Sequence, residues 1–205
     1  MGLEPLFADA KWSLLKSLSV RDMSPLELAN LLNTTISNIS QQLRLLELAG
    51  LVSKVRVPNR DKGKPRMVYS LKGDCSYVIS LGSDFAEKKL VQMSSHHRIV
   101  AKIWHMSLPE DHYYIEKLWW KLEDGNNINA FAVKLNGSGN EAVVVLDDKP
   151  KQKVSVVRVN NHGGPVKTFR CSFYNKSELN GKKLDGYHVI HDPHNLFGEN
   201  SRGAA

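Results

Sequence analysis

Short polar side chains gather in residues 35–49, a segment whose apolar residues recur at helical spacing. Ile39, Leu43 and Leu46 are four and three residues apart, so they would form one buried stripe of a helix. The other positions offer hydroxyl, amide and guanidinium groups: Thr35, Ser37, Asn38, Gln41, Gln42 and Arg44. Asn and Gln can bond twice to an adenine edge, and Arg can bind guanine or phosphate. The segment therefore predicts a helix that binds double-stranded DNA.

A basic cluster follows this segment. Between Lys54 and Lys72 there are seven basic residues and one acidic residue, Asp61. Such a cluster can supply sequence-independent affinity for phosphates. The cations expected to contact DNA are Lys54, Arg56, Arg60, Lys62, Lys64 and Arg66. Exposed hairpins also carry lysines to keep their edges soluble, so the cluster alone favours nucleic acid only weakly.

The elements that must hold these groups are readable from local signals. Residues 5–18 predict a first helix. Ser24-Pro25-Leu26-Glu27 predicts the start of a second, because Ser24 can cap, Pro25 suits the first turn and Glu27 completes a capping box. Thr35 can cap the third, and Gly50 tolerates a left-handed end. Alternating segments 51–58 and 67–71 flank the polar loop NRDKGKPR and predict a hairpin.

This order resembles a known family. The run LNTTISNISQQLRLLELAGLV resembles the recognition helix and following strand of ArsR-type winged-helix repressors. The residues that fill the pattern are Ser40, Leu43, Leu46, Gly50, Leu51 and Val52. The resemblance covers about residues 5–72. It implies that the third helix enters the major groove, that the wing contacts the minor groove or the backbone, and that the protein is a homodimer on a palindromic site. A winged helix that binds protein or RNA is the alternative.

The chain as a whole predicts an α+β protein made of three segments and a short tail. Residues 1–75 would be the winged helix-turn-helix domain, 76–123 a helical connector and dimerisation segment, 124–198 an α+β domain rich in strands, and 199–205 a disordered tail. The first connector helix would include residues 85–90 and 99–104, and the second would follow Pro109. Trp104, Trp119 and Trp120 exceed what two isolated helices can bury, which favours a homodimer. The role expected for 124–198 is sensing or assembly, with a small-molecule effector possible.

Two histidine groups could suggest metal binding, but neither shows a full set of ligands. The first is His96, His97, His105 and His112, with Glu116 one turn after His112. The second is His188, His191, Asp192 and His194, where Pro193 makes convergence unfavourable. Structural histidines explain both groups, so neither a metal site nor a cofactor is expected.

A distant resemblance to nucleotidyltransferase domains touches INAFAVKLNGSGNEAVVVLD. The acidic pair of that pattern would fall on Asn140 and Ala142, and Asp147 and Asp148 are adjacent, so in a strand they point to opposite faces. Two-metal chemistry requires convergent carboxylates. A β-hairpin turn at NGSGN is the favoured interpretation, and the protein is not expected to be an enzyme. A nucleotidyltransferase-like enzyme with a DNA-binding arm stays open as an alternative, as does a protein–protein adaptor.

Bulk properties agree with a DNA-binding regulator. The chain has 205 residues and a net charge of +7, and no apolar run is long enough to span a membrane. Its N-terminus lacks the apolar segment of a signal peptide. Cys75 and Cys171 belong to no paired motif, so no disulfide framework is expected. We expect a cytoplasmic transcriptional regulator without membrane contact.

Overall fold

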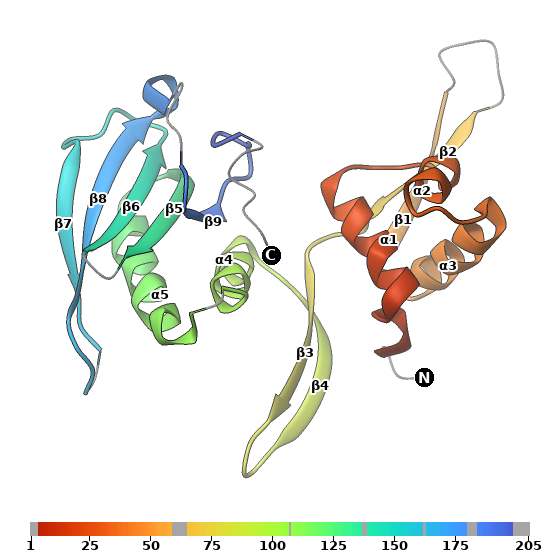
Figure 1. The fold of residues 1–205 in the computed structure, drawn as a ribbon, viewed down its shortest axis with the longest axis horizontal. Coiled ribbons are helices and arrows are strands. Elements are labelled where there is room, and N and C mark those ends of the chain that lie inside the picture. The colour runs from red at the N-terminus through yellow and green to blue at the C-terminus, as the bar shows by residue number, and fades with distance from the viewer. Residues whose placement is uncertain are drawn as a thin grey trace. The chain divides into compact units, whose positions relative to one another are not determined.

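The computed structural model describes residues 4–58, 65–106, 108–136, 139–161, 163–179 and 184–198. The chain divides into two compact units, Met1–Met93 and Ser94–Ala205 (Figure 1). Both contain helices and strands, and the expected α+β class is confirmed. The expected disordered tail, 199–205, lies outside the described residues.

The first unit begins with three helices followed by two hairpins. Its elements are η1 (Glu4–Leu6), α1 (Asp9–Val20), α2 (Pro25–Leu31), α3 (Ile36–Leu48), β1 (Val52–Val57), β2 (Arg66–Leu71), β3 (Cys75–Leu81) and β4 (Ala86–Gln92). β1 pairs antiparallel with β2, and β3 pairs antiparallel with β4. The predicted order of three helices, strand, loop and strand is confirmed.

One core holds the three helices and the wing together. Leu14 of α1, Leu28 of α2 and Leu43 and Leu46 of α3 are fully buried in it. Met23, just before α2, also bridges to Tyr69 of β2 through two backbone hydrogen bonds of 3.0 and 2.8 Å. The wing is therefore tied to the helices by backbone as well as by side chains.

The helix expected at residues 85–90 is wrong, because this segment lies in strand β4. Glu, Lys and Leu favour a helix in isolation. Here the pairing of Ala86–Gln92 with Cys75–Leu81 satisfies the backbone instead, and cross-strand packing overrides the local preference. Residues 99–104 are helical as expected, within α4 (Ser95–Trp104).

The second unit is a five-stranded sheet with two helices on one face. After α4 come α5 (Pro109–Glu123), β5 (Ile128–Asn136), β6 (Gly139–Leu146), β7 (Val154–Val159), β8 (Lys167–Asn175), η2 (Lys176–Leu179) and β9 (His188–His191). The strand order is β7-β8-β6-β5-β9, with β6 parallel to β8 and the other pairs antiparallel. The helices expected as a connector thus lie within this unit and pack on its sheet.

The tryptophans of these helices differ in burial. Trp119 is buried against Phe131 of β5, with ring centroids 5.4 Å apart. Trp104 and Trp120 are exposed; Trp104 Nε1 donates to Glu116 Oε1 at 2.7 Å, and Trp120 meets His96 edge to face. The sheet therefore covers one of the three rings whose surplus favoured a dimer.

Strands β5 and β6 decide the interpretation of the NGSGN segment. Their register runs from Ile128↔Leu146 to Asn136↔Gly139. Only Gly137 and Ser138, which lie outside the described residues, separate the paired ends. The segment connects a β-hairpin, as the favoured interpretation predicted.

Candidate nucleic-acid interface

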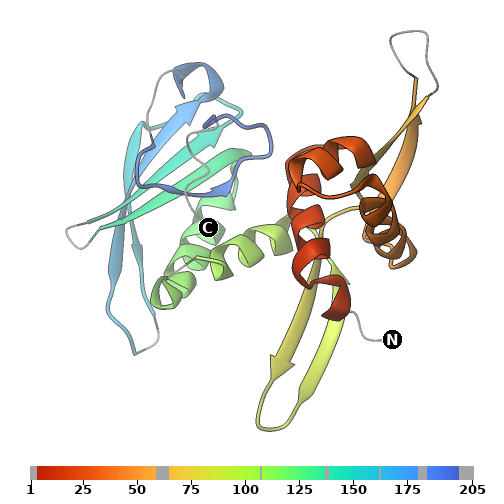
Figure 2. The ribbon, with the colours of Figure 1, turned by 45° about the vertical axis from the view of Figure 1, so that its right-hand side comes forward.

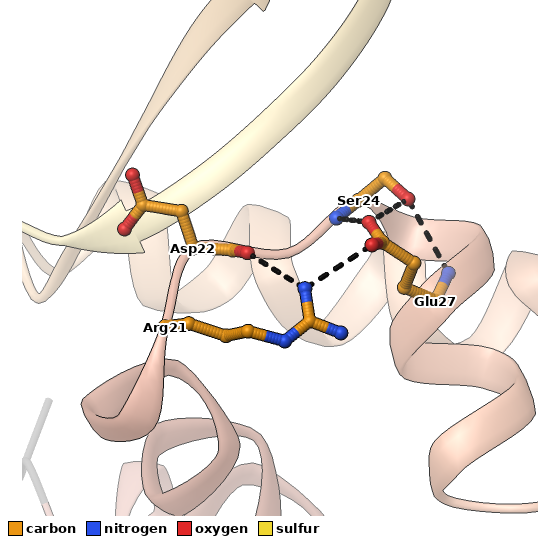
Figure 3. A network of polar contacts seen from close by, with 4 residues as sticks. All are labelled: Arg21, Asp22, Ser24 and Glu27. Atoms are coloured by element: carbon orange, nitrogen blue, oxygen red, sulfur yellow. Dashed lines mark hydrogen bonds and ion pairs between the residues drawn. The ribbon is translucent and has the colours of Figure 1, made fainter.

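The helix-turn-helix begins with a capping box at the start of α2 (Figure 3). Ser24 Oγ accepts from the Glu27 amide at 3.3 Å, while Glu27 Oε2 accepts from the Ser24 amide at 2.8 Å and from Ser24 Oγ at 2.6 Å. Arg21 Nη1 reaches Glu27 Oε1 at 3.2 Å. The Ser24 hydroxyl hydrogen bond is the largest influence that lowers the pKa of Glu27, to about 2. The predicted box is confirmed and fixes where α2 starts.

The turn between α2 and α3 is tight. Asn33 takes a left-handed conformation with φ of 50°, which Asn tolerates better than most residues. The Thr34 amide then donates to Ala29 O at 3.0 Å. Thr35 accepts from the Asn38 amide at 3.2 Å and so caps α3. Thr35 therefore positions the helix that carries the other predicted side chains.

Two opposite sides of α3 have opposite character. Ile39, Leu43 and Leu46 are buried, as predicted. At 3.6 residues per turn, the side opposite this stripe carries Ser37, Gln41, Arg44 and Leu48. All four are exposed. We call these four residues the outer stripe; it holds three groups that can hydrogen-bond to base edges or phosphates.

Asn38 and Gln42 lie beside the outer stripe and bond to each other. Asn38 Nδ2 donates to Thr34 Oγ1 at 3.1 Å, and Gln42 Nε2 donates to Asn38 Oδ1 at 3.3 Å. Gln42 is half-buried, and within the described part of the chain its Oε1 is a buried oxygen with no hydrogen-bond partner. Gln41 and Gln42 were both predicted to contact bases, but in the structure Gln41 is exposed and Gln42 is half-buried.

The end of α3 leads directly into the wing. Gly50 is left-handed, with φ of 74°, as its place predicted. Its amide donates to Glu47 O at 2.9 Å, and the Leu51 amide donates to Leu46 O at 3.0 Å, which closes the helix with a Schellman motif. The wing strand β1 starts two residues after Gly50.

An ion pair joins α3 to β1. Lys54 Nζ lies 2.8 Å from Glu47 Oε2. The hydrogen bond with Glu47 is the main reason that the pKa of Lys54 is raised. The Lys54 charge is thus partly neutralised before any phosphate approaches.

The wing cations divide between the two faces of the hairpin. Lys54 and Arg56 share one face, because side chains two residues apart on a strand point the same way. Arg66 lies opposite Val57 in the register and so occupies the other face. All three are exposed. The remaining predicted wing residues, Arg60, Lys62 and Lys64, lie outside the described residues.

Comparison with known protein families agrees with this geometry. Residues 10–54 match the family model described as bacterial regulatory protein, arsR family. This segment is therefore similar to the helix-turn-helix of that family. The match runs from α1 to the Lys54 of β1 and thus contains the whole of α3. The match supports the general prediction that the protein is a DNA-binding transcriptional regulator. No curated protein matches the chain.

The histidines of the second unit are engaged in local contacts. His97 Nδ1 lies 3.0 Å from Ser94 Oγ, His105 Nδ1 lies 2.7 Å from Ala101 O, and His112 Nε2 lies 3.1 Å from Met106 O. Glu116, the suggested partner of His112, accepts from Trp104 instead. Among the described residues, no group of three or more His, Cys, Asp or Glu is placed to hold a metal ion.

The C-terminal His/Asp group also has local roles. His191 stacks edge to face on Trp119, and burial lowers its pKa. The Asp192 carboxylate accepts from the Leu196 and Phe197 amides at 2.7 and 3.0 Å and so closes the turn after β9. These contacts give both residues a structural explanation.

Two further polar features occupy the second unit. Asp147 Oδ1 accepts from Asn129 Nδ2 at 2.7 Å and from Lys176 Nζ at 2.9 Å. A cavity of about 540 Å³ lies near the loop after β6, and its lining includes Asn126, Asn127, Lys149, Lys151 and Phe173.

In the parts of the chain that the structure covers, no helix is long and apolar enough to cross a membrane.

Proposed function

We propose that this protein is a cytoplasmic, sequence-specific transcriptional regulator that reads double-stranded DNA with the outer stripe of α3. The observation that carries the proposal is that Ser37, Gln41 and Arg44 lie on the side of α3 opposite its buried stripe. A helix anchored by one side and polar on the other is the arrangement that docks in a major groove. Gln41 would pair with adenine, and Arg44 would bind guanine or phosphate.

The wing supplies affinity rather than sequence reading in this proposal. Arg56 and Lys54 lie on one hairpin face, and Lys54 adjoins α3 through Glu47. A helix in the groove and a cation next to it on the wing would engage bases and the neighbouring backbone together. When binding depends on phosphate contacts of this kind, the logarithm of the binding constant falls linearly with the logarithm of the salt concentration.

The protein acts as a homodimer on a two-fold site, with a regulatory rather than catalytic second unit. The cavity near the loop after β6 is the candidate place for a small-molecule effector, because Lys149, Lys151 and two Asn amides offer hydrogen-bond donors around Phe173.

Selection of bound duplexes from a random pool tests the proposal. The full chain, at one fixed salt concentration, should enrich a two-fold sequence, and Gln41→Ala should relax the preference at one position in each half. Ser40→Ala is the matched control, because Ser40 Oγ bonds to Ile36 O on the flank of the helix and should leave the preference unchanged. Enrichment of no sequence would favour an adaptor that uses its winged helix for protein contact.

A further inference from the structure

Helix α3 starts with an apolar residue that the core does not take up. Ile36 is the first residue of α3, directly after the capping Thr35, and it is 48% exposed. In both ribbon views α3 lies at the outside of the three-helix group, beside the wing strands (Figures 1 and 2). The buried stripe begins one turn later, at Ile39. Much of the Ile36 side chain is therefore open to a partner at the start of the helix.

Ile36 differs in position from the other exposed apolar residues of α3. Leu45 and Leu48 are also exposed, but they follow Ile36 by nine and twelve residues. At 1.5 Å per residue they lie roughly 14 and 18 Å further along the helix axis. A recognition helix brings its N-terminal side chains to the base edges. Of these three residues, Ile36 is the one that a docked α3 would carry into the groove.

The direction of the side chain favours the same end. Every Cα–Cβ bond of a helix is tilted toward the helix N-terminus, so the side chain of a first-turn residue extends ahead of the helix. Ile36 lies on the flank of α3 rather than in the outer stripe, but this tilt directs it toward the bases. Together with Ser37 and Gln41, it would present one apolar and two polar groups to them.

The first turn of α3 holds Ile36 in a defined position. Thr35 Oγ1 accepts from the Asn38 amide at 3.2 Å, and Thr35 O accepts from the Ile39 amide at 3.1 Å. Asn38 Nδ2 also donates to Thr34 Oγ1 at 3.1 Å. The isoleucine side chain is branched at Cβ, so one χ1 rotamer dominates in a helix. Little conformational freedom would be lost when Ile36 packs against a base.

The residues around Ile36 allow a close approach to DNA. Residues 28–46, which include the first three turns of α3, contain no Asp or Glu, and Arg44 is their only Lys or Arg. No carboxylate of this segment would therefore repel the phosphates on either side of the groove. An apolar side chain in a neutral segment can enter the groove without bringing a like charge to the backbone.

Only one base offers a methyl group to the major groove. Thymine presents its C5-methyl group there, whereas the groove edges of adenine, guanine and cytosine present hydrogen-bond donors and acceptors. An isoleucine packed on the methyl group removes apolar surface of both partners from water. The same side chain over a purine N7 or O6 would leave a desolvated acceptor without a donor, which is costly. Ile36 thus favours thymine both by contact and by exclusion of the purines.

We propose that Ile36 determines specificity for thymine, by packing against the C5-methyl group of one thymine in each half of the binding site. This inference rests on the proposed function and adds a base to it. Gln41 lies about 7.5 Å further along the helix axis, which exceeds the base-pair rise of about 3.4 Å. The thymine therefore belongs to a different base pair from the one that Gln41 reads.

Duplexes in which deoxyuridine replaces thymidine test the proposal, because the exchange removes the methyl group and leaves base pairing intact. The sequence enriched by the full chain is prepared with one thymidine exchanged at a time, in one half of the site. At one position the wild type should bind the deoxyuridine duplex about fourfold more weakly, as expected for one buried methyl group. Fluorescence anisotropy at one fixed salt concentration measures the ratio of the two affinities.

Ile36→Ala removes the contact from the protein side. This variant should bind the thymidine and deoxyuridine duplexes equally, because no side chain is left to pack on the methyl group. It should fold as the wild type does, since Ala is the strongest helix former and Ile36 is half-exposed. Leu45→Ala is the matched control: it truncates another exposed aliphatic side chain of α3 and should keep the wild-type ratio. Ile36→Val, which keeps the branched Cβ, should keep most of it.

Three results would overturn the assignment of Ile36. They are an enriched sequence without thymine, a wild type that is indifferent to deoxyuridine at every position, and an Ile36→Ala variant that keeps the wild-type ratio. Each of these leaves the proposed function intact as long as the selection enriches a two-fold sequence and Gln41→Ala relaxes it. Enrichment of no sequence would overturn both.

Discussion

Gln42 Nε2 donates a hydrogen bond to Asn38 Oδ1 at 3.3 Å, which holds the Gln42 amide against the preceding turn of α3. Gln41, its neighbour in the chain, is exposed on the outer stripe. Replacing Gln41 should therefore affect DNA binding, whereas replacing Gln42 should affect the stability of the fold.

Gln41→Ala should lower the affinity for the preferred duplex by about 1–3 kcal/mol while changing affinity for scrambled DNA little. The melting temperature should stay nearly unchanged, because Gln41 has no role in the core. Fluorescence anisotropy on both duplexes at one salt concentration measures the difference. Equal losses on the two duplexes would remove Gln41 from base reading.

Gln42→Met should leave the free energy of unfolding unchanged or raise it by up to about 1 kcal/mol. The substitution keeps the size of the side chain and removes the buried Oε1 that lacks a partner, which is costly to leave unpaired. Urea denaturation gives the value. A loss of more than about 1 kcal/mol would show that the hydrogen bond from Gln42 Nε2 to Asn38 stabilises the fold by more than the unpaired Oε1 destabilises it.

The capping box predicts an acid-sensitive contribution from Glu27. Its pKa is lowered from 4.5 to about 2, so the stabilisation is complete above about pH 4.5 and is lost as the pH falls toward 2. A third of the Glu27 side chain is exposed, so we expect on the order of 1 kcal/mol after solvent screening. Unfolding free energies between pH 2 and 6 should fall less steeply in Glu27→Gln than in the wild type. Parallel curves would contradict the assignment.

Because Glu47 pairs with Lys54, replacing Glu47 should strengthen the contact between the wing and DNA. Glu47→Gln frees the Lys54 cation, so affinity for random DNA should rise and the log–log salt dependence should steepen by up to about 0.9. Lys54→Ala should do the opposite. Arg66→Ala, on the other hairpin face, shows whether both faces touch phosphate. An unchanged slope in both Glu47→Gln and Lys54→Ala would mean that this face of the wing does not contact the backbone.

Burial on α3 separates folding from recognition. Leu43→Ala should lower the free energy of unfolding by about 2–5 kcal/mol, because Leu43 is fully buried. Leu45→Ala is the matched control: the same chemical change on the same helix, at an exposed position, should cost well under 1 kcal/mol. Similar losses from the two substitutions would contradict the orientation of α3.

The helix-turn-helix could be predicted from sequence because its signals are local. Ser24, Glu27 and Thr35 each cap within three residues, and Gly50 ends α3 through its own backbone freedom. The buried stripe of α3 follows from spacing alone. Which polar residue faces outward did not follow so well, because the Asn38–Gln42 hydrogen bond depends on side-chain rotamers that spacing leaves open.

The β3–β4 hairpin was missed for the opposite reason. The segment FAEKKL has helical propensity, and its strand partner lies across a turn at Gly82. The alternation of Tyr77, Ile79 and Leu81, with β-branched and aromatic residues, was the available signal. The sheet of the second unit shows a similar limit. Its parallel β6–β8 pair joins segments far apart in sequence, and no local pattern specifies that neighbour.

The backbone bridge between Met23 and Tyr69 has a consequence for amide exchange. A hairpin alone would open often, and its amide protons would exchange with solvent quickly. In the bridge the Met23 and Tyr69 amides each donate a hydrogen bond to the other residue's carbonyl oxygen. The wing strand can therefore open at Tyr69 only when its hydrogen bonds to the segment before α2 break as well. DNA that immobilises the wing should therefore slow deuterium uptake at the Met23 amide, in the segment before α2. Protection from exchange on DNA binding should thus extend beyond the wing to the helices of the domain.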